Sequence, residues 1–108
     1  MKYNLYKGPI KQISDMTEIK NDSIIYRQTD IVFNKLDDEI VMMSIKNGEY
    51  YGLDNIGSRI WEIIEKPVTL IQLVHKLKEE YNVEIQQCEN DVIEFLEMLL
   101  KKNLIQIG

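Results

Sequence analysis

Cysteine and long apolar runs are scarce in this chain. Its 108 residues include one cysteine, Cys88, so no intrachain disulfide can form. No stretch approaches the roughly 20 apolar residues that a helix needs to cross a bilayer, and Met1–Tyr6 lacks the apolar region of a signal peptide. We therefore expect a cytoplasmic protein that has no membrane partner and is held together by packing.

Basic charge is also scarce. The chain has 13 Lys and Arg residues against 18 Asp and Glu residues, a formal net charge of −5. Because Lys and Arg supply most of the affinity for phosphates, we expect no nucleic-acid partner. A winged-helix DNA-binding regulator is the alternative function, but its recognition helix would turn carboxylates toward the DNA. That helix would present Glu89, Asn90, Asp91, Glu94 and Glu97.

The residues that catalysis or metal binding requires are few. The single histidine, His75, has no neighbours at metal-ligand spacing. Cys88 near a helix start would have a lowered thiol pKa, although a small half-buried residue is its more ordinary role. Gly52 and Gly57 do not form a phosphate-binding loop. We expect no enzymatic activity, no metal site and no cofactor, with a small thiol enzyme as the remaining catalytic alternative.

Polarity divides the chain near residue 22. Residues 1–22 are polar, contain Gly8-Pro9 and show neither a strand nor a helix period. This segment is predicted to be an N-terminal arm that is flexible or docks on a partner. Residues 23–108 carry the apolar patterns and are predicted to form one domain.

Short β-prone segments open the domain. Asp37-Asp38 signals one turn, and Asn47-Gly48 predicts a type I′ hairpin turn with positive φ at both residues. A two-residue turn there would place Ile45 opposite Tyr50 and Ser44 opposite Tyr51. The segments predict an antiparallel meander that ends at Leu53, built from Ile24–Tyr26, Ile31–Phe33, Ile40–Ile45 and Glu49–Leu53.

Both faces of this predicted sheet are apolar. One face would hold Val41, Met43, Ile45 and Tyr50, and the other Ile40, Met42, Tyr51 and Leu53. A sheet that meets water on one side alternates more cleanly. Either both faces are covered, or one surface is kept for a partner.

Two helical patterns follow the meander. The first has Asp54 as its N-cap and is stopped by Pro67. The second opens with a capping box at Thr69 and Gln72 and extends to Tyr81.

A third helical pattern runs from about Cys88 to Lys102, and Asn103 can take the left-handed conformation that ends it. Residues 104–107 then form a short terminal strand or tail. The order predicts an α+β fold that is winged helix-turn-helix-like, a three-stranded antiparallel meander followed by three helices. Such a fold assigns no function by itself.

The last strand of the meander is a candidate binding edge. An edge strand can accept an extended peptide through its unpaired N–H and C=O groups, while neighbouring pockets select alternate side chains. Glu49–Leu53 leads straight into a helix and is apolar on alternate positions. The alternative is that Tyr50, Tyr51 and Leu53 are ordinary core residues and the edge is covered.

The chain from about Ile31 to Ile105 resembles the PqqD-like family of peptide-recognition domains, and most closely the standalone lasso-peptide leader-binding proteins. The Tyr-Tyr-Gly-Leu and Gly-x-Arg-Ile-Trp-Glu segments are its more specific parts, and the helical repeats are weaker. Asp54 stands where asparagine is frequent, and Asn103 where glycine is frequent. The matching segments are 49–62, Pro67–Thr69 with the helix that it opens, 88–99 and 103–105.

This resemblance implies a non-catalytic adaptor. A precursor leader peptide would add antiparallel to the last strand of the meander, Glu49–Leu53, which is the third strand of the three-stranded sheet, and would lie between that strand and the third helix. Its partners would be a biosynthetic protease, a cyclase or a radical maturase. The implied peptide-binding residues are Glu49, Tyr50, Tyr51, Gly52 and Leu53 on the strand, and Asp91, Val92, Phe95, Met98 and Leu99 on the helix.

The N-terminal arm carries a second resemblance. Tyr6-Lys7-Gly8-Pro9 is similar to the Tyr-x-x-Pro of lasso leaders, although Lys11 stands where an apolar residue would be expected. Residues 3–13 could therefore dock like a leader on this chain's own groove or on that of a second copy. Docking between two copies would produce an arm-swapped dimer.

Overall fold

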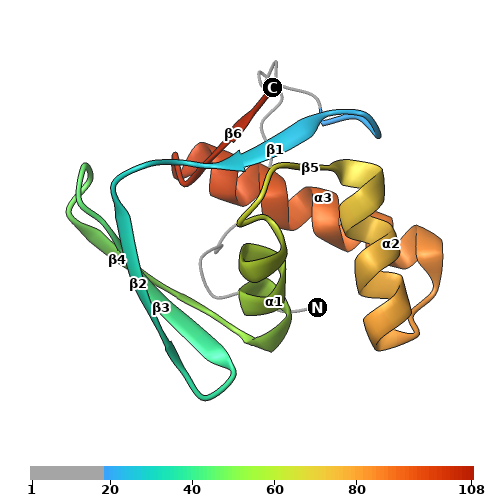
Figure 1. Ribbon diagram of the computed structural model, residues 1–108, viewed down its shortest axis with the longest axis horizontal. Helices are drawn as coiled ribbons and strands as arrows, with labels where there is room; N and C mark the ends of the chain where they lie inside the picture. The colour runs from blue at the N-terminus through green and yellow to red at the C-terminus, as the bar shows by residue number, and fades with distance from the viewer. Residues whose placement is uncertain (1–18) are drawn as a thin grey trace.

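A computed structural model describes residues 19–108, so residues 1–18 of the predicted arm lie outside the described residues. The described chain contains three helices and six strands arranged in two antiparallel sheets (Figure 1). The α+β class, with a three-stranded meander followed by three helices, is confirmed. The elements are β1 (Ile24–Arg27), β2 (Ile31–Leu36), β3 (Glu39–Ser44), β4 (Glu49–Leu53), α1 (Asn55–Ile63), β5 (Val68–Thr69), α2 (Leu70–Tyr81), α3 (Ile85–Lys101) and β6 (Ile105–Ile107).

The predicted meander is the sheet β2-β3-β4, and its last turn differs from the expected one. Ser44 pairs with Glu49 and Met42 with Tyr51, so the register is shifted by two residues from that predicted. The type I′ turn was wrong because Gly48 has a positive φ of 71° but Asn47 does not. The connection is instead four residues long, and it is closed by a hydrogen bond from the Gly48 N–H to the Ser44 carbonyl at 2.7 Å.

The two faces of the meander contain the predicted residues despite this shift. Side chains alternate with a period of two, and a slip of two residues keeps every side chain on its own face. The face turned toward α1 is buried, and it holds Ile40, Met42, Tyr51 and Leu53. The opposite face remains largely exposed at Val32, Val41 and Tyr50.

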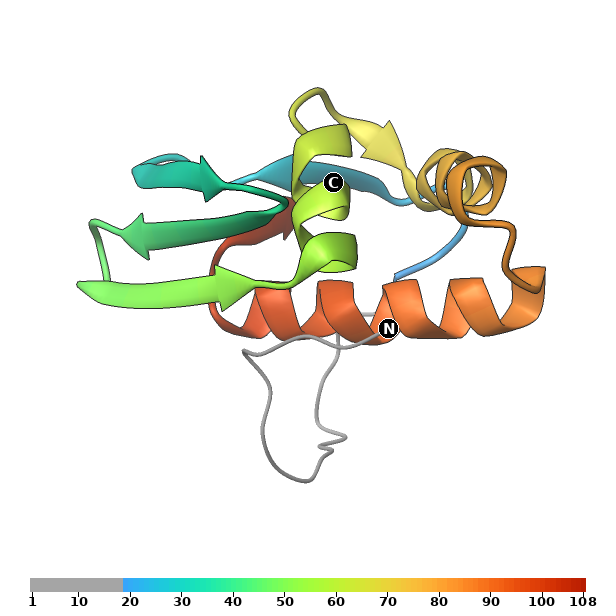
Figure 2. The same cartoon turned by 90° about the horizontal axis from the view of Figure 1, so that it is seen from below.

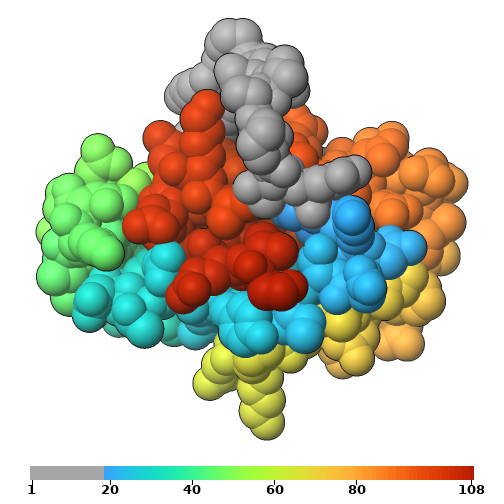
Figure 3. Space-filling model, turned by 90° about the horizontal axis from the view of Figure 1, so that it is seen from above, coloured from blue at the N-terminus to red at the C-terminus, as the bar shows by residue number. Residues whose placement is uncertain are grey.

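A second sheet was not foreseen. Ile24–Tyr26 does not join the meander, because β1 pairs with β5 on one side and β6 on the other. Residues 104–107 supply that partner as β6, and β5 comes from Val68 and Thr69 just before α2. In the space-filling view β1 (blue) and β6 (red) lie side by side on the surface (Figure 3).

Local chemistry fixes the start of α1 against the meander. The Asp54 carboxylate caps the helix by accepting the Gly57 N–H at 2.8 Å, as predicted. The buried Ser58 hydroxyl accepts the Ile40 N–H at 2.8 Å and donates to the Leu53 carbonyl at 3.1 Å. Ser58 therefore bridges β3 and β4 at the point where the strand pair opens toward the helix.

The other helices begin and end largely as the sequence indicates. The capping box of Thr69 and Gln72 opens α2, and Asn103 takes a left-handed φ of 62° after α3. Helix α3 begins at Ile85, three residues before the predicted start, because Glu84 caps it by accepting the N–H groups of Gln86 and Gln87. Figure 2 shows α3 running beneath α1 along one side of the molecule.

The core lies where α1 and α3 meet the inner face of the meander. Trp61 and Phe95 are its largest fully buried side chains. The guanidinium of Arg27 lies 4.5 Å from the Trp61 ring centroid and donates from Nε to the Trp61 carbonyl at 3.1 Å. Ile19 is also buried in this core. None of the helices in residues 19–108 is both long and apolar enough to span a bilayer.

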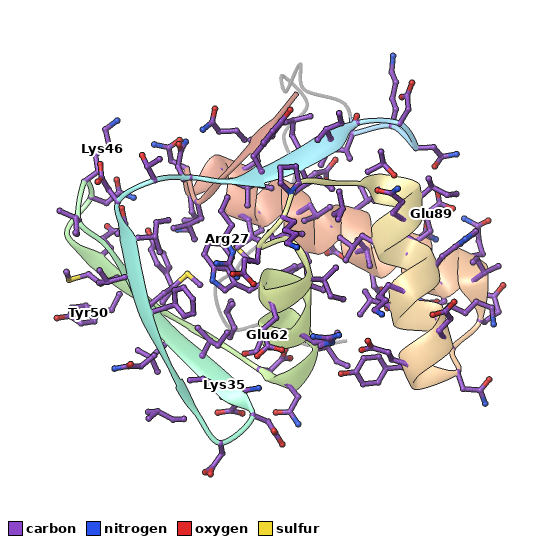
Figure 4. All side chains as sticks on the ribbon, viewed as in Figure 1. Arg27, Lys35, Lys46, Tyr50, Glu62 and Glu89 are labelled. Carbon is purple, nitrogen blue, oxygen red and sulfur yellow. The ribbon has the colours of Figure 1, made fainter. Side chains whose placement is uncertain are left out.

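A chain of ion pairs joins the meander to the helices. Lys35 of β2 contacts Glu62 of α1 at 2.8 Å, and Figure 4 shows the two side chains pointing toward one another. Arg59 contacts the same carboxylate at 3.3 Å and holds Glu80 of α2 with two bonds of 2.8 Å. Hydrogen bonds from Lys35 and from Arg59 hold the pKa of Glu62 and of Glu80, respectively, below the usual glutamate range.

Replacing Ser58 by alanine should destabilise the fold, because the buried Ile40 N–H and Leu53 carbonyl lose their shared partner. We expect a loss of about 1–3 kcal/mol in the free energy of unfolding. Urea denaturation measures it, with Asn55→Ala on the exposed side of the same helix as the control. An unchanged midpoint for Ser58→Ala would mean that the two strands close up and pair directly.

The Arg59–Glu80 pair should stabilise the protein in a pH-dependent way. Its folded-state carboxylate pKa is lowered, so its contribution is present above the ordinary glutamate pKa and is lost as pH falls through the lowered value. Glu80→Gln should therefore cost up to about 1 kcal/mol at neutral pH and little in strong acid. The comparison is between wild type, Glu80→Gln and the neighbouring Glu79→Gln, by denaturation at both pH values; a pH-independent difference for Glu80→Gln would contradict the assignment.

Candidate functional site

The predicted binding strand, β4, is at the edge of its sheet. Among residues 19–108, β4 pairs with β3 alone, and its other edge has no strand partner. Figure 2 shows β4 (light green) on the same side of the molecule as α3, with β2 on the opposite side of β3. The edge and the helix together form the candidate site.

The hydrogen-bond pattern identifies which backbone groups face the free edge. The Ile45 N–H donates to the Asp30 carbonyl at 3.0 Å, in register with the β2–β3 ladder. Backbone groups alternate in direction along a strand, so Val41 and Met43 of β3 also point toward β2. The intervening residues of β3 must then point toward β4.

Residues of β4 that lie opposite those groups use their own backbone in the β3–β4 ladder. Glu49, Tyr51 and Leu53 occupy these positions, and the Ser58 bridge to the Leu53 carbonyl is consistent with this. The N–H and C=O groups of Tyr50 and Gly52 therefore point to the free edge. Their two-residue spacing is the repeat at which an added antiparallel strand forms its hydrogen bonds.

The side chains of β4 divide between the two faces. Tyr51 and Leu53 point into the core, whereas Tyr50 is 71% exposed on the outer face. The Tyr51 hydroxyl donates to Oε1 of Glu49 at 2.7 Å. Burial, together with this bond, raises the pKa of the Tyr51 phenol. The inward side chains therefore anchor the strand. The backbone N–H and C=O groups of Tyr50 and Gly52 point to its free edge.

The predicted residues of α3 form the wall of the core behind this edge. Val92, Phe95, Met98 and Leu99 are all buried, and Asp91 is half-buried. A Cβ placed on Gly57 would lie 3.1 Å from Cζ of Phe95, so a larger residue at position 57 would require the buried Phe95 ring to shift by a few tenths of an ångström. The structure thus brings the start of α1, directly after β4, against the middle of α3.

A pocket of about 230 Å³ lies beside the first turn of α1. It shares Asp91 and Val92 with the predicted site, and Oδ1 of Asp91 accepts a hydrogen bond from the Gln87 amide at 2.9 Å. The other residues were missed from sequence because their proximity depends on how α2 packs on α3; the apolar Val83 in a polar connection was the available signal. The pocket is lined by Ile56, Leu77, Tyr81, Val83, Gln87, Cys88, Asp91 and Val92.

Among the described residues, Cys88 and His75 do not form a catalytic arrangement. Cys88 is buried, and burial raises the pKa of its thiol, so the lowered pKa expected from its place in the helix was wrong. Desolvation is the larger cause, and the nearby carboxylate of Asp91 raises the thiol pKa further. His75 is exposed on α2. Within residues 19–108 no group of three or more His, Cys, Asp or Glu side chains is arranged to hold a metal ion.

Known structures resemble this one over most of the described chain. "TbiB1 in Complex with the TbiA(beta) Leader Peptide" is 33% identical in sequence, with a TM-score of 0.71, over 75% of this chain and 94% of that chain. "Lasso peptide synthetase B1 complexed with the leader peptide" has a TM-score of 0.68 at 20% identity, over 76% of this chain and 96% of that chain, and supports the fold alone. No match is found among curated proteins.

The family comparison covers the site itself. The model described as "Coenzyme PQQ synthesis protein D (PqqD)" matches residues 39–105, which include β3, β4 and all three helices. The match spans more than half of the chain. The protein therefore belongs to the PqqD family.

Proposed function

We propose that this protein binds the leader segment of a ribosomally made precursor peptide as an added strand on β4 and presents it to a modifying enzyme. The observation that carries the proposal is the free edge of β4, where the backbone groups of Tyr50 and Gly52 have no strand partner among residues 19–108. The likeness to TbiB1, whose structure contains a leader peptide, supports it.

An antiparallel leader would have a defined register on this edge. The leader residue opposite Tyr51 points inward toward the core wall, and its two neighbours, opposite Tyr50 and Gly52, point to the outer face. The N-terminal part of the leader would continue past Leu53 toward the pocket beside Ile56. Asp91 at that pocket places a carboxylate where a basic group or a hydroxyl of the leader would be held.

The activity that follows from this geometry is delivery. Binding the leader raises the effective concentration of the attached core segment at the partner enzyme, and the adaptor itself performs no chemistry. The proposed enzyme partners are a protease, a cyclase or a radical maturase. The net charge of −5 favours a neutral or basic leader.

No observation within the described residues favours the DNA-binding alternative. The exposed positions of α3 include Asn90, Glu94 and Glu97, and a recognition helix with two such carboxylates would meet phosphates of the same charge sign. Retention on duplex DNA at moderate salt would be needed to revive that role.

Tyr50→Pro should abolish most leader binding. Proline removes the Tyr50 N–H and places its ring at the edge that the leader approaches, while the β3–β4 ladder keeps its hydrogen bonds. We expect at least a tenfold loss of affinity beyond that of Tyr50→Ala, which removes the same side chain but keeps the N–H. Calorimetric titration with leader peptides encoded beside this gene, and with the TbiA(beta) leader, measures it. Equal affinities for the two variants would contradict strand addition.

The N-terminal arm is proposed to compete for the same edge. Deleting residues 1–15 leaves the buried Ile19 in place and should tighten leader binding, because a competitor for the groove is removed. The same titration, combined with sedimentation of both forms, also tests an arm-swapped dimer, which the deletion would convert to monomer. Unchanged affinity and unchanged mass would assign the arm no role at the edge.

A further inference from the structure

Gly52 is a glycine that the described fold does not require. Its φ lies outside the left-handed region. Among the glycines of residues 19–108, Gly48 alone has a left-handed φ. A Cβ built on Gly52 meets nothing within 4 Å, in contrast to Gly57, where a Cβ would press on Phe95. Glycine inside a strand weakens it, because it adds backbone entropy and leaves no side chain to pack. Neither backbone conformation nor packing within the described residues accounts for this glycine, so we look for its role in what the strand binds.

The surroundings of Gly52 on the outer face are apolar and open. Its cross-strand partner on β3 is Val41, which is 41% exposed, and Tyr50 lies two residues along the same face of β4. Tyr50 in turn pairs with the half-buried Met43. Figure 4 shows the Tyr50 side chain pointing away from α1, on the solvent side of the sheet. Glycine thus leaves an open position at the free edge that is bounded by two apolar side chains.

We propose that this open position receives a bulky apolar or aromatic side chain of the bound leader. The inference rests on the proposed function, because it uses the leader as an added antiparallel strand. In that register the leader residue opposite Gly52 points to the outer face, where its side chain can lie across the glycine and against Tyr50 and Val41. An aromatic side chain on a neighbouring strand is known to cover and stabilise an edge glycine in this way.

The recognised ligand is then more specific than an extended peptide. It carries a bulky apolar residue opposite Gly52, an inward-facing residue immediately after it opposite Tyr51, and a second outward residue opposite Tyr50. The protein would recognise leader side chains on both faces of the sheet. The inward residue meets the core wall, and the outward residue is selected by the space that Gly52 leaves.

Gly52→Val tests the inference, because valine fills the open position and its Cβ would meet no described atom within 4 Å. The free protein should keep its thermal stability or gain some, since valine favours a strand. Affinity for the leader that binds wild type most tightly should fall at least tenfold, with a smaller loss for Gly52→Ala. Asn34→Val is the matched control: Asn34 lies in the same cross-strand row as Val41 and Gly52, but on β2 at the opposite edge. Its leader affinity should equal that of wild type.

Peptide variants complete the test. Replacing the leader residue opposite Gly52 by alanine should weaken binding to wild type several-fold, and should have much less effect on binding to Gly52→Val. Wild-type affinity for Gly52→Val, or equal effects of the peptide change on both proteins, would overturn this inference while leaving strand addition intact. If wild type binds no leader, the proposed function fails and this inference fails with it.

Discussion

The pairing of β3 with its two neighbouring strands determines which backbone groups of β4 face the open edge of the sheet. Its backbone groups alternate between β2 and β4, so the residues of β4 that face it are Glu49, Tyr51 and Leu53. Because backbone groups alternate in direction along a strand, those of Tyr50 and Gly52 face the open edge. Ser58 holds the end of this strand pair through hydrogen bonds to Ile40 and Leu53, and thereby joins the register of the strands to the start of α1. The position of the edge relative to α3 follows from that junction.

In the proposed function, the same strand therefore serves stability and binding through different atoms. Its inward side chains, Tyr51 and Leu53, are part of the core with Phe95 of α3, and they hold the strand in place. Its edge groups have no strand partner among residues 19–108 and are the groups that the proposed leader would pair with. A strand already fixed in place loses little conformational entropy when a peptide is added. The ion pairs from Lys35 through Glu62 and Arg59 to Glu80 join the meander to α1 and α2. A strand edge held in place beside α3 is what the proposed adaptor role requires.

Local sequence signals predicted what depends on local chemistry. The caps at Asp54 and Thr69, the left-handed Asn103 and the membership of the two sheet faces follow from neighbouring residues or from a period of two, and all were confirmed. The Asn47-Gly48 turn was wrong because the Ser44 hydroxyl and carbonyl organise a longer loop. The second sheet and the pocket at α2 and α3 join segments far apart in the chain, and no local pattern specifies such contacts. The peptide-binding residues stay a prediction.

Hydrogen exchange of individual backbone amides in the leader complex tests the central claim most directly. Tyr50 and Gly52 N–H groups should exchange readily in the protein with residues 1–15 removed and become strongly protected when a leader is bound. The Tyr51 N–H, which faces β3, should change far less. Saturating leader binding that leaves the Tyr50 and Gly52 amides unprotected would show that the leader binds elsewhere, and would contradict strand addition at β4.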